Sequence, residues 1–287
     1  AVSTWGTLTV NSGTLTLAAA AETFNGAVNI AGGTLSLGNA FTASSTTSVT
    51  GSIVNTSSST TKTFTGLVTV QSGGSINLTT ATVPAVVIGA GVTTVSGAGT
   101  VNFGTGATTF NNTTPTFSGP VNINIGATTI ATAQTLTNNM SGTLTMQSAS
   151  ISAPATANGM SLASGSTTTT TTTLTFAANT TANASTITMN GTANLNVTTN
   201  LVMSNAPTST GNNLIACGSS GSGTLTVTGT TSITGNSTST GLQGIDMTAG
   251  GGGCNVVFTG LATITGGTNA TGKAQVKLGT GNATFSR

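Results

Sequence analysis

Ionisable side chains, the groups on which most enzyme chemistry depends, are almost absent from this 287-residue chain. The acids are Glu22 and Asp246, the bases are Lys62, Lys273, Lys277 and Arg287, and there is no histidine and no tyrosine. Acid–base and nucleophilic catalysis both need a proton acceptor placed beside the reacting group. Because serine and threonine lack such a base here, we expect a protein that is not an enzyme.

The same composition argues against most ligands. Glycoside cleavage needs two carboxylates about 5 to 10 Å apart, whereas Glu22 and Asp246 lie near opposite ends of the chain. Without histidine or clustered acids there is no ligand set for a metal, so we expect no metal and no cofactor. A net charge of +2 without a basic patch predicts no nucleic-acid partner. No apolar run reaches the roughly 18 to 20 residues of a membrane span, so we expect no membrane insertion.

Cys217 and Cys254 are the only two cysteines. In an oxidising compartment they can form a disulfide, and the alternative is two free buried thiols. Their separation along the chain corresponds to one or two coils of a repeat protein, so both side chains can meet on one face or across one corner.

A strand motif recurs along the chain: glycine, any residue, an apolar residue, Thr, Asn or Ser, and a second apolar residue. Copies begin at Gly6, Gly13, Gly26, Gly33, Gly66, Gly74, Gly99, Gly119, Gly142, Gly223 and Gly260. Alternation of apolar and polar residues at period two predicts short strands with one buried face. Repetition on this scale is typical of a solenoid.

Spacing between motif copies varies widely, from the short step between Gly6 and Gly13 to the long step between Gly142 and Gly223. A parallel β-helix accommodates this variation because loops of different length can leave its corners. We therefore predict an all-β fold, a right-handed parallel β-helix with irregular coils of roughly 20 residues, as one domain over residues 1–287. A tandem β-sandwich is the alternative. The threonine tract within 166–173 is predicted to form a strand or its entry rather than a linker.

Two stretches carry a family resemblance. Gly13-Thr-Leu-Thr-Leu17 and the segment Phe24-Asn-Gly-Ala-Val-Asn-Ile-Ala-Gly-Gly-Thr-Leu-Ser-Leu-Gly38 resemble the passenger-associated repeats of bacterial autotransporters. Gly99-Thr-Val-Asn-Phe-Gly-Thr-Gly-Ala-Thr-Thr-Phe110 is similar to repeats of very large secreted adhesins from Bacteroidetes-type bacteria. Both resemblances imply right-handed β-helices on cell surfaces, and neither carries a functional residue over to this chain.

Core-like sequence reaches close to both ends of the chain, which predicts solenoid ends without polar caps. We expect such ends to stack head to tail, so that the partner is a second copy and the product is a surface filament. The candidate interface residues are Trp5, Leu8, Val10, Val276, Leu278 and Phe285. Glu22 near one end and Lys273, Lys277 and Arg287 near the other add weak charge complementarity.

Two other functions are consistent with the same composition. The chain could be the stalk fragment of a bacterial surface adhesin, although no residue pattern identifies the host surface or glycan that it would contact. Repeated Thr-x-Thr motifs, as in Thr7/Thr9 and Thr14/Thr16, are also what an ice-binding β-solenoid resembles. Irregular motif spacing argues against the flat, lattice-matched face that ice binding needs.

The expected location is extracellular or on the cell surface. The chain begins at Ala1 without a basic-then-apolar leader, which is consistent with a secreted protein whose signal peptide has been removed.

Overall fold

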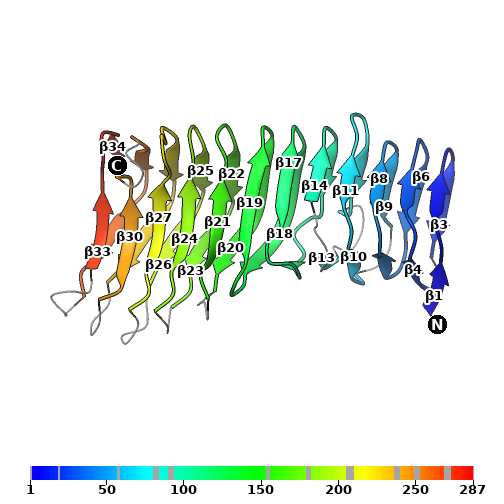
Figure 1. Cartoon of the computed structure of the whole chain (residues 1–287), viewed down its shortest axis with the longest axis horizontal. Coiled ribbons are helices and arrows are strands. Elements are labelled where there is room, and N and C mark those ends of the chain that lie inside the picture. The colour runs from blue at the N-terminus through cyan, green and yellow to red at the C-terminus, as the bar shows by residue number, and fades with distance from the viewer. Residues whose placement is uncertain are drawn as a thin grey trace. The chain divides into compact units, whose positions relative to one another are not determined.

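A computed structural model describes residues 2–18, 20–56, 59–79, 84–89, 94–152, 156–178, 182–204, 210–235, 240–248, 253–267 and 273–286. Arg287, one of the bases that we expected at the C-terminal end, lies outside these residues. All regular structure in the described ranges is β-strand, and every strand pair there is parallel (Figure 1). None of these ranges holds a helix that could cross a membrane.

The strands follow one another around three faces, so that most strands pair with the strand three places further along the chain. Near the long strand β18 (Asn122–Ile130) the step is two places, as between β16 and β18. This is a parallel β-solenoid, as the alternating motif predicted, and not a β-sandwich. The first face comprises β1 (Val2–Trp5), β4 (Ala21–Phe24), β7 (Phe41–Ala43), β10 (Lys62–Phe64), β13 (Val86–Ile88), β16 (Thr108–Phe110), β23 (Thr173–Phe176), β26 (Asn200–Met203), β29 (Thr230–Thr234) and β32 (Ala262–Thr265).

The second face is a sheet of twelve strands. Its strands are β2 (Leu8–Val10), β5 (Val28–Ile30), β8 (Thr47–Val49), β11 (Val68–Val70), β14 (Thr94–Gly97), β17 (Thr116–Gly119), β19 (Thr135–Met140), β21 (Asn158–Leu162), β24 (Ser185–Met189), β27 (Asn213–Cys217), β30 (Leu242–Asp246) and β33 (Lys273–Lys277).

The third face comprises β3 (Thr14–Leu17), β6 (Thr34–Leu37), β9 (Ser52–Asn55), β12 (Ser75–Asn77), β15 (Thr100–Asn102), β22 (Thr167–Thr170), β25 (Asn194–Val197), β28 (Thr224–Val227), β31 (Asn255–Phe258) and β34 (Ala283–Phe285). Two longer strands, β18 (Asn122–Ile130) and β20 (Thr143–Ile151), turn a corner between faces. Thus β18 pairs with β15 through its first residues and with β16 through Thr128.

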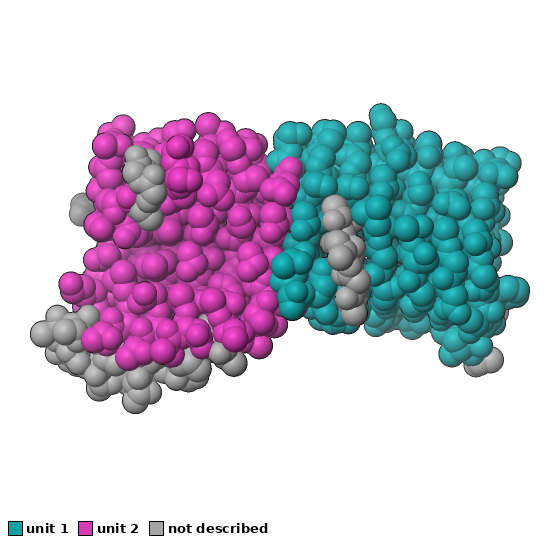
Figure 2. Space-filling model, in the orientation of Figure 1, with its two compact units in different colours: residues 1–128, 140–145 teal, residues 129–139, 146–287 magenta. Residues whose placement is uncertain are grey.

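The described residues form two compact units (Figure 2). Unit 1 contains residues 1–128 and 140–145, and unit 2 contains residues 129–139 and 146–287. Each unit repeats the same three-faced coil.

Coil length differs between the units because more residues separate consecutive strands in unit 2, while the paired strands stay aligned. In unit 1, Leu8 aligns with Val28 of the next coil. In unit 2, Leu242 aligns with Lys273, a clearly longer step along the chain. The corner between the first and second faces holds only positions 6–7 after β1, but positions 204–212 after β26. The sequence therefore predicted irregular coils correctly, and the coil length that we expected fits most coils of unit 1 but not the longer coils of unit 2.

Inward side chains form the core of each unit, and in unit 1 phenylalanines lie close together there although the strand register does not align them. In unit 1 the rings of Phe24, Phe41, Phe64 and Phe103 lie 5.8 to 6.0 Å apart from one to the next. In unit 2 the threonine tract supplies β22 and the start of β23, and Thr168 and Thr170 are buried. An internal polar column also lies in unit 2, where Ser185 donates to Asn158 at 2.8 Å.

Outward positions of the third face form two parallel columns of neutral polar side chains, which we call the polar array. In unit 1 its pairs are Thr14/Thr16, Thr34/Ser36, Ser52/Val54, Ser75/Asn77, Thr100/Asn102 and Asn122/Asn124. In unit 2 they are Thr167/Thr169, Asn194/Asn196, Thr224/Thr226 and Asn255/Val257. Val54 and Val257 are the two departures from Thr, Ser and Asn.

Lys62 is a charged side chain in the core of unit 1. It alternates with Phe64 on β10, and it is aligned with Phe41 on one side and Val86 on the other. Its Nζ is held by backbone oxygens, donating to Asn39 O at 2.6 Å and to Thr60 O at 3.0 Å. Burial lowers the pKa of this amine to about 8, because a charged group is disfavoured away from water.

The folding stability of the protein should therefore rise between about pH 8 and pH 10.5. In this window the unfolded chain, with a lysine pKa of 10.5, binds more protons than the folded chain, with a pKa of about 8. The increment has an upper bound of about 3 kcal/mol. Denaturation followed by circular dichroism across this range should show it in the native chain and not in Lys62→Met. The exposed Lys273→Met is the control, and an equal rise in Lys62→Met would contradict the assignment.

Candidate functional site

Unit 1 begins with a coil whose inner surface is open to solvent. Trp5 on β1 is aligned with the buried Phe24 of the next coil, yet its side chain is 53% exposed. Leu8 and Val10 on β2 are aligned with the buried Val28 and Ile30. Leu8 is half-buried and Val10 is buried. These three candidate residues thus occupy inward, core-type positions of the first coil.

A hollow of about 300 Å³ lies over this coil, lined by Trp5, Leu8, Leu15, Leu17, Phe24, Glu22 and the backbone around Gly6. Trp5 Nε1 donates a hydrogen bond of 2.5 Å to Glu22 Oε2 at its edge. The indole N–H and the carboxylate are therefore hydrogen-bonded to one another, while the apolar side chains of Trp5 and Leu15 remain exposed to solvent.

Unit 2 ends with a second open coil. A hollow of about 640 Å³ is lined by Thr259, Gly260, Leu261, Ala262, Phe285 and Ser286. Phe285 is 65% exposed, although its ring stacks on the buried Phe258 with centroids 5.3 Å apart. Val276 is half-buried and Leu278 is exposed. The candidates from this end therefore also lie in the terminal coil.

Backbone groups of these two coils are open as well. Within the described residues, β1, β2 and β3 have a strand partner on one side only, and the same holds for β32, β33 and β34. Unpaired N–H and C=O groups at a sheet edge are a template for pairing with another chain. These six edges are thus open to pairing with further strands.

Sequence reasoning missed four exposed apolar residues of these coils, namely Val2, Leu15, Leu261 and Ile264. Leu15 belongs to a motif copy that we could identify, but the motif does not say which copy lies at an end. Leu261 and Ile264 belong to the motif copy that begins at Gly260. The motif therefore marked them as apolar strand positions, but it gave no indication that they would be exposed.

The few charged groups of unit 2 do not gather into a site. Lys277 Nζ lies 3.6 Å from Asp246 Oδ2, and Lys273 on the same strand is exposed. Burial alone would raise the pKa of Asp246, but hydrogen bonds from Thr248 and the charge of Lys277 together lower it. This half-exposed ion pair contributes less than about 1 kcal/mol. Lys277 is thus engaged within its own chain, which weakens the charge complementarity expected between chain ends.

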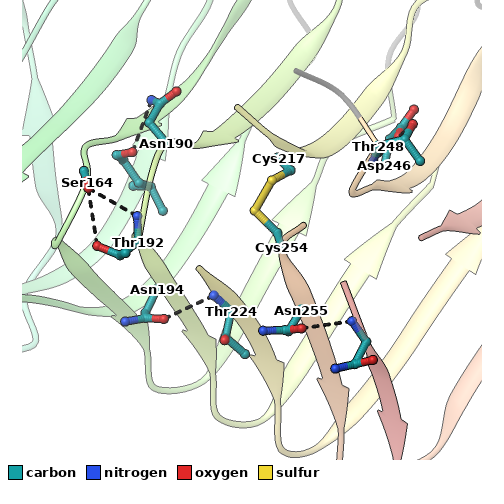
Figure 3. The surroundings of a disulfide bond; sticks show 12 residues. Ser164, Asn190, Thr192, Asn194, Cys217, Thr224, Asp246, Thr248, Cys254 and Asn255 are labelled. Carbon is teal, nitrogen blue, oxygen red and sulfur yellow. Dashed lines mark hydrogen bonds between the residues drawn. A yellow bond between two sulfur atoms is a disulfide. The ribbon is translucent and has the colours of Figure 1, made fainter. Parts of the chain in front are cut away.

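A disulfide joins Cys217 and Cys254, with their Cα atoms 5.8 Å apart (Figure 3). Cys217 ends β27 and Cys254 immediately precedes β31, so the bond ties one coil of unit 2 to the next. Both cysteines are buried. Gly221 lies against this bond, because a Cβ there would be 2.3 Å from Cys217 Sγ and 2.7 Å from Cys254 Sγ.

Among the described residues, no group of three or more His, Cys, Asp or Glu side chains could hold a metal ion. The chain matches no protein-family model, no curated protein and no solved structure. Its geometry defines a class, the parallel β-solenoids, and no family within that class is identified.

Reduction of the disulfide should lower the free energy of unfolding by about 3 to 4 kcal/mol, because the bond closes a long loop between positions 37 apart in the chain. Intact-mass measurement should find no alkylation before reduction and two alkylated thiols after it. A variant with Cys217→Ser and Cys254→Ser should be insensitive to reductant. Full alkylation without reductant would contradict the bond and weaken the case for an oxidising location.

Gly221→Ala should destabilise unit 2 by about 1 to 3 kcal/mol, since the added methyl group overpacks the buried sulfur atoms. The matched control is Gly266→Ala, an exposed position whose Cβ would have no described atom within 4 Å. Chemical denaturation of both variants measures the difference. Equal stability of the two variants would show that the contact with the disulfide is not tight.

Proposed function

We propose that this chain is an extracellular, non-enzymatic structural protein that assembles head to tail into a filament. The last coil of one copy stacks on the first coil of the next. The observation that supports this most strongly is that the two open coils present matching sets of strand edges and inward apolar side chains.

The strand edges match in order, and their lengths differ by no more than two residues on any face. Chain order around the coil is first, second and third face both for β1, β2, β3 and for β32, β33, β34. The first set has 4, 3 and 4 residues, and the second has 4, 5 and 3. A second copy can therefore continue parallel pairing on all three faces. The longer coils of unit 2 do not prevent this, since their strands stay aligned from coil to coil.

The inward side chains are also complementary. In a joint that pairs inward positions with inward positions, Trp5 faces Ile264, Val10 faces Val276 and Leu17 faces Phe285. At the other inward positions, Ser3, Leu8 and Leu15 meet Ala262, Ala274 and Ala283. Large side chains thus face small ones at several of these positions, and apolar burial stabilises the contact.

Because the two surfaces differ, the contact is heterologous and does not close on itself. Repetition of the contact gives a filament. The disulfide and the resemblance to surface β-helix repeats support an extracellular location.

The second candidate is a stalk fragment of a bacterial surface adhesin. The same open coils support it, because the next coil of a longer chain would cover them as well as a second copy does.

Trp5→Asp should raise the concentration needed for assembly by at least about a hundredfold, equivalent to about 3 kcal/mol. The substitution places a carboxylate where the partner coil would bury it. Light scattering and sedimentation against concentration provide the measurement, with circular dichroism to verify that the β-fold is retained.

The control is Leu67→Asp, a side chain that is 40% exposed in unit 1 but lies outside the first coil. It should assemble like the native chain. If the native chain stays monomeric at high concentration, or if Trp5→Asp polymerises normally, the adhesin-stalk hypothesis replaces the filament.

A further inference from the structure

We propose that the polar array on the third face is a binding surface for ice. The inference does not depend on filament assembly, since the array lies on outward positions of the coils and the proposed joint lies on their ends.

The array repeats regularly in two directions. Neighbouring strands in a sheet are about 4.8 Å apart, and alternate residues on one strand are roughly 6.7 Å apart. Ser75/Asn77, Thr100/Asn102 and Asn122/Asn124 follow one another in this way on β12, β15 and β18. A surface that repeats in two dimensions fits a partner with a repeating surface of its own, which a single soluble molecule does not have.

Irregular motif spacing does not disturb this repeat, contrary to the objection that the sequence raised. The step along the chain from Ser75 to Thr100 is longer than the step from Ser52 to Ser75, yet the paired strands stay aligned residue by residue. The paired strands take up none of the additional residues, so the polar columns continue without a shift.

The absence of charged side chains from the array indicates what kind of partner it can bind. All positions of the array are uncharged, and all but Val54 and Val257 carry hydroxyl or amide groups that both donate and accept hydrogen bonds. Ser36 alone among them is buried. Lys62 points into the core, and Asp246 and Lys277 lie on the second face. The partner should therefore be neutral and should itself present alternating donors and acceptors.

The other faces are less regular. On the first face of unit 1, short strands such as β7 and β10 present one outward residue each, Thr42 and Thr63. On the second face of unit 2, Leu214 and Ala216 interrupt the polar positions. The first face of unit 2 also has two outward columns, Thr173/Thr175, Asn200/Val202 and Thr230/Ser232. The third face is therefore the one that carries two polar columns in both units.

Ice and crystalline polysaccharides both have uncharged, repeating surfaces. The side chains of the array favour ice. Flat sugar rings are bound mainly through aromatic side chains, and the array contains none. Ice presents water molecules as donors and acceptors at spacings comparable with those of adjacent strands. Hydroxyl and amide groups can hold such waters in place at little entropic cost.

Nanolitre osmometry of the complete chain with single ice crystals provides the test. We expect a gap between melting and freezing temperatures and faceted crystal growth. Thr100→Lys, at an exposed position in the array, should lose more than half of this gap. The matched control Thr109→Lys alters an exposed threonine of β16 on the first face of the same unit, and it should keep the gap.

The Trp5→Asp variant separates this proposal from assembly, because a monomer with an intact array should still show the gap. Absence of a gap for the native chain would overturn the proposal, as would equal loss in Thr100→Lys and Thr109→Lys. Sedimentation with crystalline cellulose or chitin without any effect on ice would also overturn it and would assign the array to a polysaccharide.

Discussion

Hydrogen bonding between aligned parallel strands is the interaction on which the rest of this structure depends. Each strand finds its backbone partners in the coil before it and the coil after it. Alignment fixes whether a side chain points inward or outward, so neighbouring coils share the same inward and outward positions. The buried polar column and the outward polar array both follow from this one constraint. So do the open edges of β1 and β34, where the next coil is missing from the described residues.

The same constraint explains why a chain with so few charges can still have specific surfaces. Coulomb attraction contributes little here, since the ion pair of Lys277 with Asp246 is half-exposed. A buried charge is kept only where carbonyl oxygens surround it, as around Lys62. Under the two proposals, recognition therefore depends on strand edges, inward apolar side chains and repeated neutral hydrogen-bonding groups, all of which are set by register rather than by single reactive residues.

Alternation within each motif was enough to predict the strands, their inward faces and the solenoid, because period two and repetition are local properties of the sequence. Even Lys62 had a local signal, since it lies two positions before Phe64 and so shares its inward side. Other features depend on distant alignment. The contact of Gly221 with the disulfide, the exposure of Leu261 and the continuity of the polar array require knowing which residues lie side by side in successive coils. Varying corner lengths conceal that alignment.

Cryo-electron microscopy of the chain, at a concentration where it scatters light, tests most directly whether the open edges are completed by a second copy. The account predicts parallel strands spaced about 4.8 Å apart that continue without interruption through the joint. At that joint β32 should pair with β1, β33 with β2 and β34 with β3 of the next copy. Separate particles, or joints that leave these six strand edges facing solvent, would contradict it.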